Sequence, residues 1–485
     1  MAPAKGVEQV LTSSGPFPHL NFPQAARLCY TAIVVKIASC ISSHSARSSA
    51  TGIILGLFFV VLAGRLFRLS YRYAVNIFFW DQWVFNNATL FQKHSAWQMF
   101  RWQFGPHRLG LGPLLSSLIE PHFRWNSRAE SFLACTIVVV ATACALFLKK
   151  RLFGELVISD VAIPIVYLSA MQYESLFITS DLAHGPLPLL LLTLYCLAWT
   201  VSNRPLQYLL VLSINFVTTY TGFGLFLGFL TPILLLVDYW ANLKKEPRGG
   251  LYLAAALLIS GASLASFFYG YKLQPAVSCF SLKLQSPFQY VQYVILMFAN
   301  IFGAKGAGAL QQFSGALVLL WLLWAFASAG SKMMQNAATS WVQAAVSATL
   351  VAYSLLFTFT TAFGRLCLGL SSAQSSRYTN YLALGIFGAY LQLVSLKPST
   401  LRRVLLTVVS LALLTSLPIR SEDRGTMRFF SAIKTNWRNC YLAGGSIKQC
   451  DTIAGYQIEP EPVPVLQRKL DYLKRNELNL FSGSK

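Results

Sequence analysis

Long stretches of uncharged, largely apolar residues recur along this chain of 485 residues. Each stretch matches or approaches the roughly 20 apolar residues that a helix needs to cross a hydrocarbon core about 30 Å thick. The stretches without Asp, Glu, Lys or Arg are 131–148, 182–203, 249–271, 306–331, 333–364 and 378–396, and the run 205–237 is long enough for two short spans. The pattern predicts an all-α polytopic membrane protein and excludes a soluble enzyme, a fibrous protein and a disordered chain.

Composition and charge agree with this prediction and add an orientation. Charged residues make up 12% of the chain and hydrophobic residues 55%, whereas a soluble globular protein carries roughly 25% charged residues. Basic residues cluster beside the apolar stretches at 149–151, 244–248 and 397–403, as the positive-inside rule expects of cytoplasmic loops. Because basic residues lie at the ends of apolar spans, the net charge of +22 fits a membrane protein, and we expect membrane lipids and no nucleic acid as partners.

The expected topology has three parts. Residues 1–47 form a cytoplasmic leader with a short interfacial helix at Leu28–Ile41, and 48–418 form the transmembrane domain. Within that domain, 73–128 is a first outer loop whose Trp residues are typical of helices lying at the membrane interface. Residues 419–485 form a small C-terminal region outside the cytoplasm.

The basic clusters also fix the number of crossings. An additional span at 288–303 would place the cluster 397–403 on the outer side, so we expect this segment to be re-entrant or interfacial. The prediction is about 11 spans, with a range of 10 to 13, the N-terminus inside and the C-terminus outside.

The cysteines bear on metal binding and on disulfide formation. None of the nine cysteines shows a spacing typical of metal ligands. Cys440 and Cys450 differ from the others because they lie in the polar region after the last span. If that region is outside the cytoplasm, a disulfide between them is expected.

Polar residues of the expected outer side begin with the sequence Trp80-Asp81-Gln82-Trp83, just after the first span. An acid between two Trp side chains at the membrane surface is partly desolvated, which raises its pKa and suits a general base. The structural alternative is an aspartate that caps an interfacial helix over Gln82–Phe91.

Three further segments add cations and a second acid on the same side. His107-Arg108 precedes an apolar helix, and an arginine suits a phosphate or, alternatively, lipid headgroups. Glu174, in Gln172-Tyr173-Glu174-Ser175, is either functional or a solvated helix end, and Asp181 and His184 are second-rank candidates nearby. Arg365, Arg377 and Tyr378 complete the set, either as a phosphate site or as headgroup anchors.

These motifs, in this order and over roughly residues 50–485, resemble the GT-C superfamily of membrane glycosyltransferases, in particular a large and poorly characterised bacterial branch. The elements that carry the likeness are Trp80–Trp83, His107-Arg108, Gln172–Leu176, Gly364-Arg365 with Ser376–Tyr378, Trp437–Cys440 with Cys450, and Leu478–Phe481. The chain departs from the pattern at Gln82, where a second acid is common, and at Gly105-Pro106, where Asn-Glu is common. The loss of acids weakens a site for the divalent cation that the resemblance leaves open, so we assign no metal or other cofactor.

The resemblance implies transfer of a sugar from a polyprenyl-phosphate donor to a glycan, lipid or protein acceptor, on the periplasmic or exterior side of a bacterial inner membrane. The reaction would be a single displacement with inversion, in which Asp81 acts as base or orients the acceptor hydroxyl. The cationic residues would bind the phosphate, Arg377 first, then Arg365 and Arg108, with His107 and Tyr378 beside them. Glu174 would assist the base or bind sugar hydroxyls, and Trp80, Trp83 and Gln172 would contact the sugar.

Three other functions stay open at this point. A glycan polymerase or ligase of another membrane fold would share the outer-side arginines. A flippase or transporter of lipid-linked sugars would need polar groups in mid-membrane, which the spans lack. A catalytically inactive scaffold would be insensitive to the loss of Asp81.

Overall fold

The computed structural model describes residues 46–92, 94–244, 246–274, 279–280, 286–335 and 338–482. The predicted interfacial helix Leu28–Ile41 lies outside the described residues. The chain divides into two compact units, Met1–Gly56 and Leu57–Lys485. Of the first unit the structure describes only the start of helix α2 (Ala46–Tyr73), and the features below belong to the second unit.

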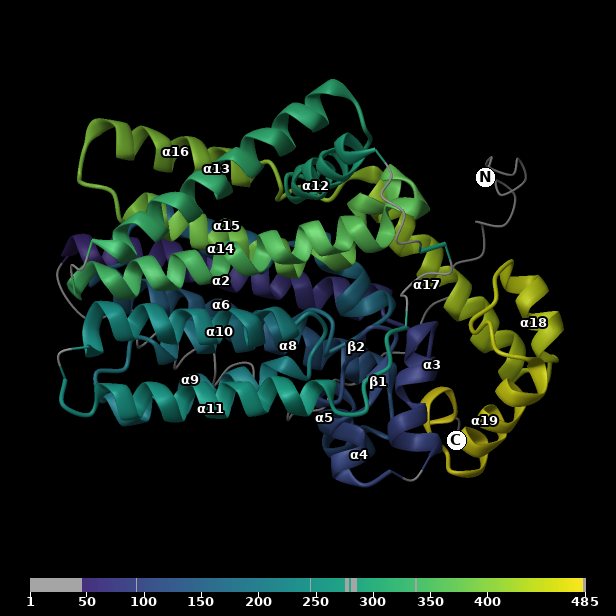
Figure 1. Cartoon of the computed structure of the whole chain (residues 1–485). Helices are drawn as coiled ribbons and strands as arrows, with labels where there is room; N and C mark the ends of the chain where they lie inside the picture. Colours follow the sequence, from purple (N-terminus) through teal and green to yellow (C-terminus); the bar gives the residue numbers. More distant parts are fainter. Residues whose placement is uncertain are drawn as a thin grey trace. The chain divides into compact units, whose positions relative to one another are not determined.

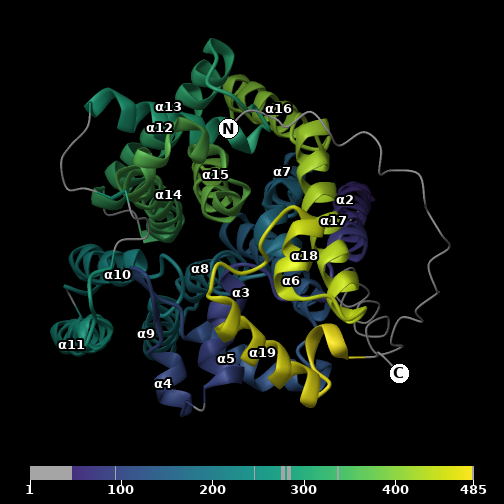
Figure 2. The same ribbon diagram turned by 90° about the vertical axis from the view of Figure 1, so that its right-hand side faces the viewer.

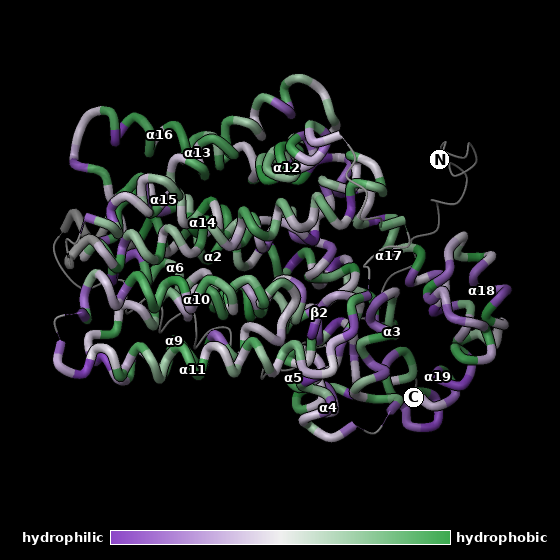
Figure 3. The backbone as a smooth tube through the Cα atoms, viewed as in Figure 1, coloured by the Kyte–Doolittle hydropathy of each residue, from purple (hydrophilic) through white to green (hydrophobic). Residues whose placement is uncertain are grey.

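Long apolar helices dominate this unit, and Figure 3 shows hydrophobic residues along most of their length. In the described part of the chain, six helices are long and apolar enough to cross a membrane, and two shorter apolar helices accompany them. The long ones are α2, α6 (Ser127–Phe153), α10 (Leu225–Asp238) with its extension η6 (Tyr239–Leu243), α11 (Gly249–Phe268), α13 (Ala309–Met334) and α14 (Ala338–Arg365). The prediction of an all-α membrane protein is therefore confirmed in this coarse form.

Shorter helices fill the intervals between them. They are α7 (Ala162–Tyr167), with the 3-10 turns η3 (Ile158–Val161) and η4 (Ala170–Gln172) before and after it, the π-helical turn η5 (Glu174–Ile178), α8 (Pro186–Ala198), α9 (Arg204–Thr219), α15 (Thr379–Val394) and α16 (Thr400–Leu414). Helix α15 is the most enclosed, since Thr379 to Leu393 are all buried. Its apolar sequence on every side is the pattern of a helix surrounded by others.

Two glycines let α15 approach α14 closely. A Cβ atom at Gly388 would lie 2.8 Å from the Cβ atom of Leu350 and 2.9 Å from the carbonyl of Ser347. At Gly385 a Cβ atom would meet the side chain of Ser354. Small residues of this kind favour close packing of membrane helices, because the two backbones can then make contact.

Helix α12 (Pro287–Ile301) runs in a different direction from its neighbours and is seen nearly end-on in Figure 1. Contacts along its length reach the segment that follows α14. Tyr293 hydrogen-bonds Ser372 at 2.9 Å, and the amide of Asn300 donates to the carbonyl of Ser375 at 3.5 Å. A helix with these contacts lies against one end of the long helices.

The first outer loop folds into short pieces rather than one long helix. They are α3 (Asp81–Phe85), the π-helical turn η1 (Asn87–Phe91), α4 (Ala96–Phe100), the strands β1 (Gln103–Phe104) and β2 (His107–Arg108), α5 (Leu111–Ile119) and the 3-10 turn η2 (Glu120–Phe123). The strands pair antiparallel, with Phe104 opposite His107. The expected helix Gln82–Phe91 is broken at Asn86, whose side-chain amide donates to the carbonyl of Gln82 at 2.8 Å, as asparagines that compete with helical hydrogen bonds do.

The C-terminal region forms α17 (Ser421–Leu442), α18 (Ile447–Ala454), α19 (Val463–Arg475) and the turn η10 (Asn479–Phe481). Figures 1 and 2 place these helices beyond one end of the long helices, beside α3. A disulfide joins Cys440 to Cys450, as predicted. The bond ties the end of α17 to α18.

Asn479 attaches this region to both ends of the first outer loop. Its side-chain oxygen accepts from the backbone N–H of Phe78 at 3.2 Å, and its amide donates to the carbonyl of Trp125 at 2.7 Å and to Ser127 at 3.0 Å. The amide of Asn76 donates to the carbonyl of Asn479 at 2.7 Å. One buried residue therefore holds the start and the end of the loop together.

Candidate functional site

Most of the predicted site residues line one cavity of about 360 Å³. Its walls come from the first outer loop, from η5 and the segment after it, from the loop between α9 and α10, and from the end of α14 through the start of α15. The lining residues are Asp81, Phe104, Gly105, Pro106, His107, Glu174, Ser175, Thr179, Asp181, His184, Phe223, Arg365, Arg377, Tyr378 and Tyr381. Asp81, His107, Glu174, Arg365, Arg377 and Tyr378, which lie far apart in the sequence, thus share one surface.

Asp81 is the first residue of α3, and its position depends on the residue before it. Trp80 has φ 52° and ψ −124°, a strained conformation for a residue with a side chain. Its backbone N–H donates to the carbonyl of Ile458 at 3.0 Å, and its ring packs on Phe79 and Phe430 at centroid distances of 4.7 and 5.1 Å. The C-terminal region therefore helps to hold the backbone turn that presents Asp81 to the cavity.

The carboxylate of Asp81 does not act as the helix cap that was the structural alternative. The N-cap position belongs to Trp80, and no side chain caps the helix there. The Asp81 side chain is 39% exposed, and its Oδ2 lies 4.0 Å from Nη1 of Arg377. Burial raises the pKa of Asp81 above its usual value, and the charge of Arg377 offsets part of that effect.

Glu174 and Arg377 form the strongest polar contact of the cavity. Oε1 of Glu174 accepts from Nε of Arg377 at 2.9 Å and also from Nη2. Oε2 accepts from Ser375 and Ser376 at 3.0 and 3.3 Å. Burial favours the neutral form of Glu174, but the charge of Arg377 and these hydrogen bonds lower its pKa below the usual value. Burial likewise opposes the charge of Arg377, but Glu174 and Asp81 raise its pKa.

Arg365, the last residue of α14, differs from Arg377 in its partners. Among the described residues, no carboxylate forms an ion pair with Arg365. It lines the cavity and acts electrostatically on His107 and Tyr293. A cavity cation that has no carboxylate partner in the described part of the chain is a stronger candidate for binding an anion than one that already holds two carboxylates.

Two imidazoles lie together on another wall. The His107 ring packs edge-to-face on Phe223 at 4.4 Å and on His184 at 5.2 Å. Burial lowers the pKa of His107 well below its usual value, and the neighbouring His184 and Arg365 lower it further. Nδ1 of His184 hydrogen-bonds Oδ2 of Asp181 at 2.6 Å. From the sequence, Asp181 and His184 were only second-rank candidates. Their i, i+3 spacing, however, already brings an acid and a histidine close enough for contact.

Four predicted residues lie elsewhere. Arg108 is 3% exposed and donates to the carbonyls of Phe267 at 2.7 Å, Tyr269 at 2.8 Å and Arg101, so its guanidinium anchors the loop after α11, and we withdraw it from the phosphate site. Trp83 is fully buried and Gln172 is 1% exposed. The ring of Trp80 packs in an aromatic cluster, as described above. The sequence could not separate these structural tasks from ligand contacts.

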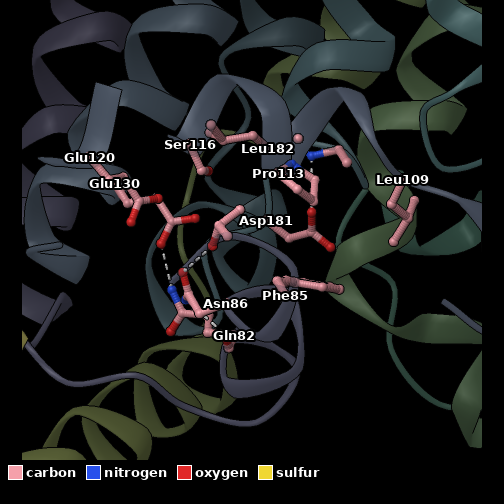
Figure 4. A pocket seen from close by; sticks show the side chains of 13 residues that line it. Gln82, Phe85, Asn86, Leu109, Pro113, Ser116, Glu120, Glu130, Asp181 and Leu182 are labelled. Atoms are coloured by element: carbon pink, nitrogen blue, oxygen red, sulfur yellow. Dashed lines mark hydrogen bonds between the residues drawn. The ribbon is translucent and has the colours of Figure 1, made fainter. Parts of the chain in front are cut away.

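A second, much smaller cavity of about 20 Å³ adjoins the first, with Asp181 in the lining of both (Figure 4). This volume is enough for about one water molecule. Figure 4 shows Gln82 pointing toward Glu130, and the Gln82 amide donates to Oε2 of Glu130 at 2.7 Å. The Gln82 side chain therefore connects the turn after Asp81 to α6. In the described part of the chain, no group of three or more His, Cys, Asp or Glu residues could hold a metal ion.

A second disulfide, between Cys279 and Cys367, lies beside the cavity and was not predicted. It connects the segment after α11 to the residues that directly follow Arg365. The two cysteines are separated by 88 residues, so no local spacing could have paired them.

Comparison of the chain with models of protein families, with curated proteins and with solved structures found no match. The likeness to the GT-C superfamily therefore rests on the order of short motifs. The function has to be inferred from the residues that line the cavity.

Proposed function

We propose that the chain is a membrane glycosyltransferase that moves a sugar from a polyprenyl-phosphate donor to an acceptor on the outer side of the membrane. The observation that carries the proposal is the single cavity shared by Asp81, Glu174, Arg365 and Arg377. An acid that faces two arginines suits a reaction in which a hydroxyl attacks and a phosphate leaves. These residues come from segments separated by almost 300 residues, so local sequence does not explain their meeting.

The placement of charges along the chain supports an outer location for the cavity. We infer 11 crossings, formed by α2, α6, the run Ile158–Gln172, α8, α9, α10, α11, α13, α14, α15 and α16, with α12 lying along the membrane surface. This count places the three basic clusters on one side and the cavity on the other, in agreement with the positive-inside rule. Both disulfides lie on the cavity side of this topology, which suits an oxidising compartment such as the bacterial periplasm or exterior.

Arg365 and Arg377 have different roles in this proposal. The leaving phosphate gains charge in the transition state, so fixed cations beside it accelerate the reaction. Arg365 binds the phosphate most directly because, within the described ranges, it has no carboxylate partner. Arg377 supports it from a position fixed by Glu174, whose carboxylate is fully occupied by four hydrogen bonds.

Asp81 holds the acceptor hydroxyl, as proton acceptor or as orienting group. Its half-exposed carboxylate faces the cavity, and its raised pKa brings its protonation closer to neutral pH. Attack of the hydroxyl on the anomeric carbon, on the side opposite the phosphate, gives a single displacement with inversion. A glycan polymerase or ligase would use the same arginines and differs in the size of its acceptor.

The test is the mass profile of cell-surface glycans from cells that lack the protein, restored with wild type, Asp81→Asn or Asp471→Asn at matched membrane levels. Asp471 lies on the exposed side of α19 and is the matched control. We expect a sugar-sized mass with wild type and with the control, and its absence with Asp81→Asn. The same profile with all three proteins would refute the role of Asp81, and no sugar-sized change with any of them would refute glycosyl transfer.

A further inference from the structure

The side chain of His184 is held in one orientation by Asp181. Oδ1 of Asp181 accepts from the backbone N–H groups of Ala183 and His184 at 2.9 and 3.1 Å, and Oδ2 contacts Nδ1 of His184 at 2.6 Å. An aspartate with three such hydrogen bonds is fixed as an acceptor. Nδ1 of the imidazole then donates its proton to Asp181, and in the neutral form of the ring Nε2 is the atom with a free lone pair.

Nε2 of His184 has no hydrogen-bond partner within the part of the chain that the structure describes. His184 lines the large cavity together with Asp81, Arg365 and Arg377, and its side chain is 22% exposed. A side chain that lines a cavity and carries a polar atom without a partner is a candidate to meet a ligand group. A neutral imidazole oriented by a carboxylate is also the arrangement that proteins use to remove protons from hydroxyl groups.

Asp81 is better placed to orient the hydroxyl than to keep its proton. Its carboxylate lies 4.0 Å from Nη1 of Arg377, and the charge of this guanidinium offsets part of the rise that burial causes in the pKa of Asp81. Among the described residues, the ion-pair partner of His184 is Asp181, whereas that of Asp81 is Arg377. The other imidazole, His107, is 5.2 Å away between ring centroids and is enclosed by Phe223.

Resting on the proposed function, we infer that His184, oriented by Asp181, is the base that receives the proton of the acceptor hydroxyl, and that Asp81 orients this hydroxyl. The hydroxyl oxygen forms a bond to the anomeric carbon while the bond from that carbon to the phosphate oxygen breaks. The electron pair of the broken bond leaves with the phosphate, next to Arg365. The proton moves to Nε2 of His184, and the resulting imidazolium is stabilised by Asp181 until it releases the proton to the departing phosphate or to water.

The experiment uses the full chain in cells and adds imidazole from outside, where it reaches the cavity without crossing the membrane. Cells that lack the protein are restored with wild type, His184→Ala, Asp81→Asn or His107→Ala, and the sugar-sized mass on surface glycans is followed over time with and without imidazole. The space left by the histidine ring opens into a cavity of about 360 Å³, so imidazole can occupy it. We expect His184→Ala to lower the rate by roughly 100-fold or more, and imidazole to restore it at least tenfold in this variant alone.

Rescue of His184→Ala without rescue of Asp81→Asn or His107→Ala supports the inference, because a merely structural histidine would not be replaced by the free base. A rate for His184→Ala within threefold of wild type overturns it, and so does a loss that imidazole does not reverse. If His184→Ala does not accumulate in membranes, His184→Gln decides, since glutamine can still bond Asp181 but cannot take up a proton: full activity overturns the inference and loss supports it. Absence of transfer by wild type refutes the proposed function itself, which separates the two failures.

Discussion

The contact between Glu174 and Arg377 allows the electrostatics of the cavity to be tested independently of any substrate. We predict that Glu174→Gln and Arg377→Gln, made singly and together, show a coupling free energy of about 2–3 kcal/mol in unfolding. A hydrogen bond to a charged group is worth roughly 1.5–3 kcal/mol, and Arg377 donates two to Glu174. The expected sum is reduced because the Arg377 side chain is 33% exposed and water screens its charge.

The assay is unfolding of the purified full chain in detergent by chemical denaturant, for wild type, both single variants and the double variant. The pH dependence gives a second measure. Because the pKa of Glu174 is lowered in the folded protein, its contribution is present above its usual value of 4.5 and is lost as the pH falls through the lowered, folded value. Glu174→Gln removes this dependence. A coupling below about 0.5 kcal/mol, or an unchanged pH dependence in Glu174→Gln, would refute the reasoning.

Three further predictions concern the surroundings of the cavity. Asp81→Asn should raise the melting temperature at pH 7 by a few degrees while transfer is lost, because the raised pKa of Asp81 makes its ionised form cost folding stability as the pH rises above 3.8; an equal or lower melting temperature would contradict this. Asn479→Ala should lower the free energy of unfolding by about 2–4 kcal/mol and also lower transfer, since the first outer loop loses its attachment; wild-type stability in denaturant would argue against the contact. Replacing Cys279 and Cys367 by serine should lower the free energy of unfolding by about 3–5 kcal/mol, and reducing agent, which also breaks Cys440–Cys450, should lower wild type at least as far, whereas equal stability of wild type and the serine variant without reductant would show that the bond does not form.

The membrane class of the fold could be predicted because crossing a bilayer requires long apolar stretches, and those stretches are visible in composition alone. Breaks within helices and close helix packing could not be predicted, because they depend on specific contacts that hydrophobic periodicity does not indicate. The expected helix Gln82–Phe91 breaks at Asn86, whose side-chain amide donates to the carbonyl of Gln82. The close packing of α14 and α15 depends on Gly385 and Gly388, whose partners are far away in the sequence.

The candidate site, like the fold, could be predicted from the sequence only in part. Motif resemblance brought forward Asp81, Glu174 and Arg377, and the structure places them in one cavity. The motif resemblance did not distinguish Arg108 from the other arginines. The partners of Arg108 are backbone carbonyls at the end of α11, which become its neighbours only after folding. The contact between Asp181 and His184 could have been predicted from the sequence, since residues three apart are close enough for direct contact.

The most direct test of the account is the mass spectrum of polyprenyl-phosphate lipids from cells that lack the protein and from cells restored with wild type or Asp81→Asn. If the chain transfers a sugar from such a lipid, a polyprenyl phosphate carrying that sugar accumulates without the protein, falls when wild type is restored, and stays high with Asp81→Asn. Identical lipid profiles in all three strains would contradict the account.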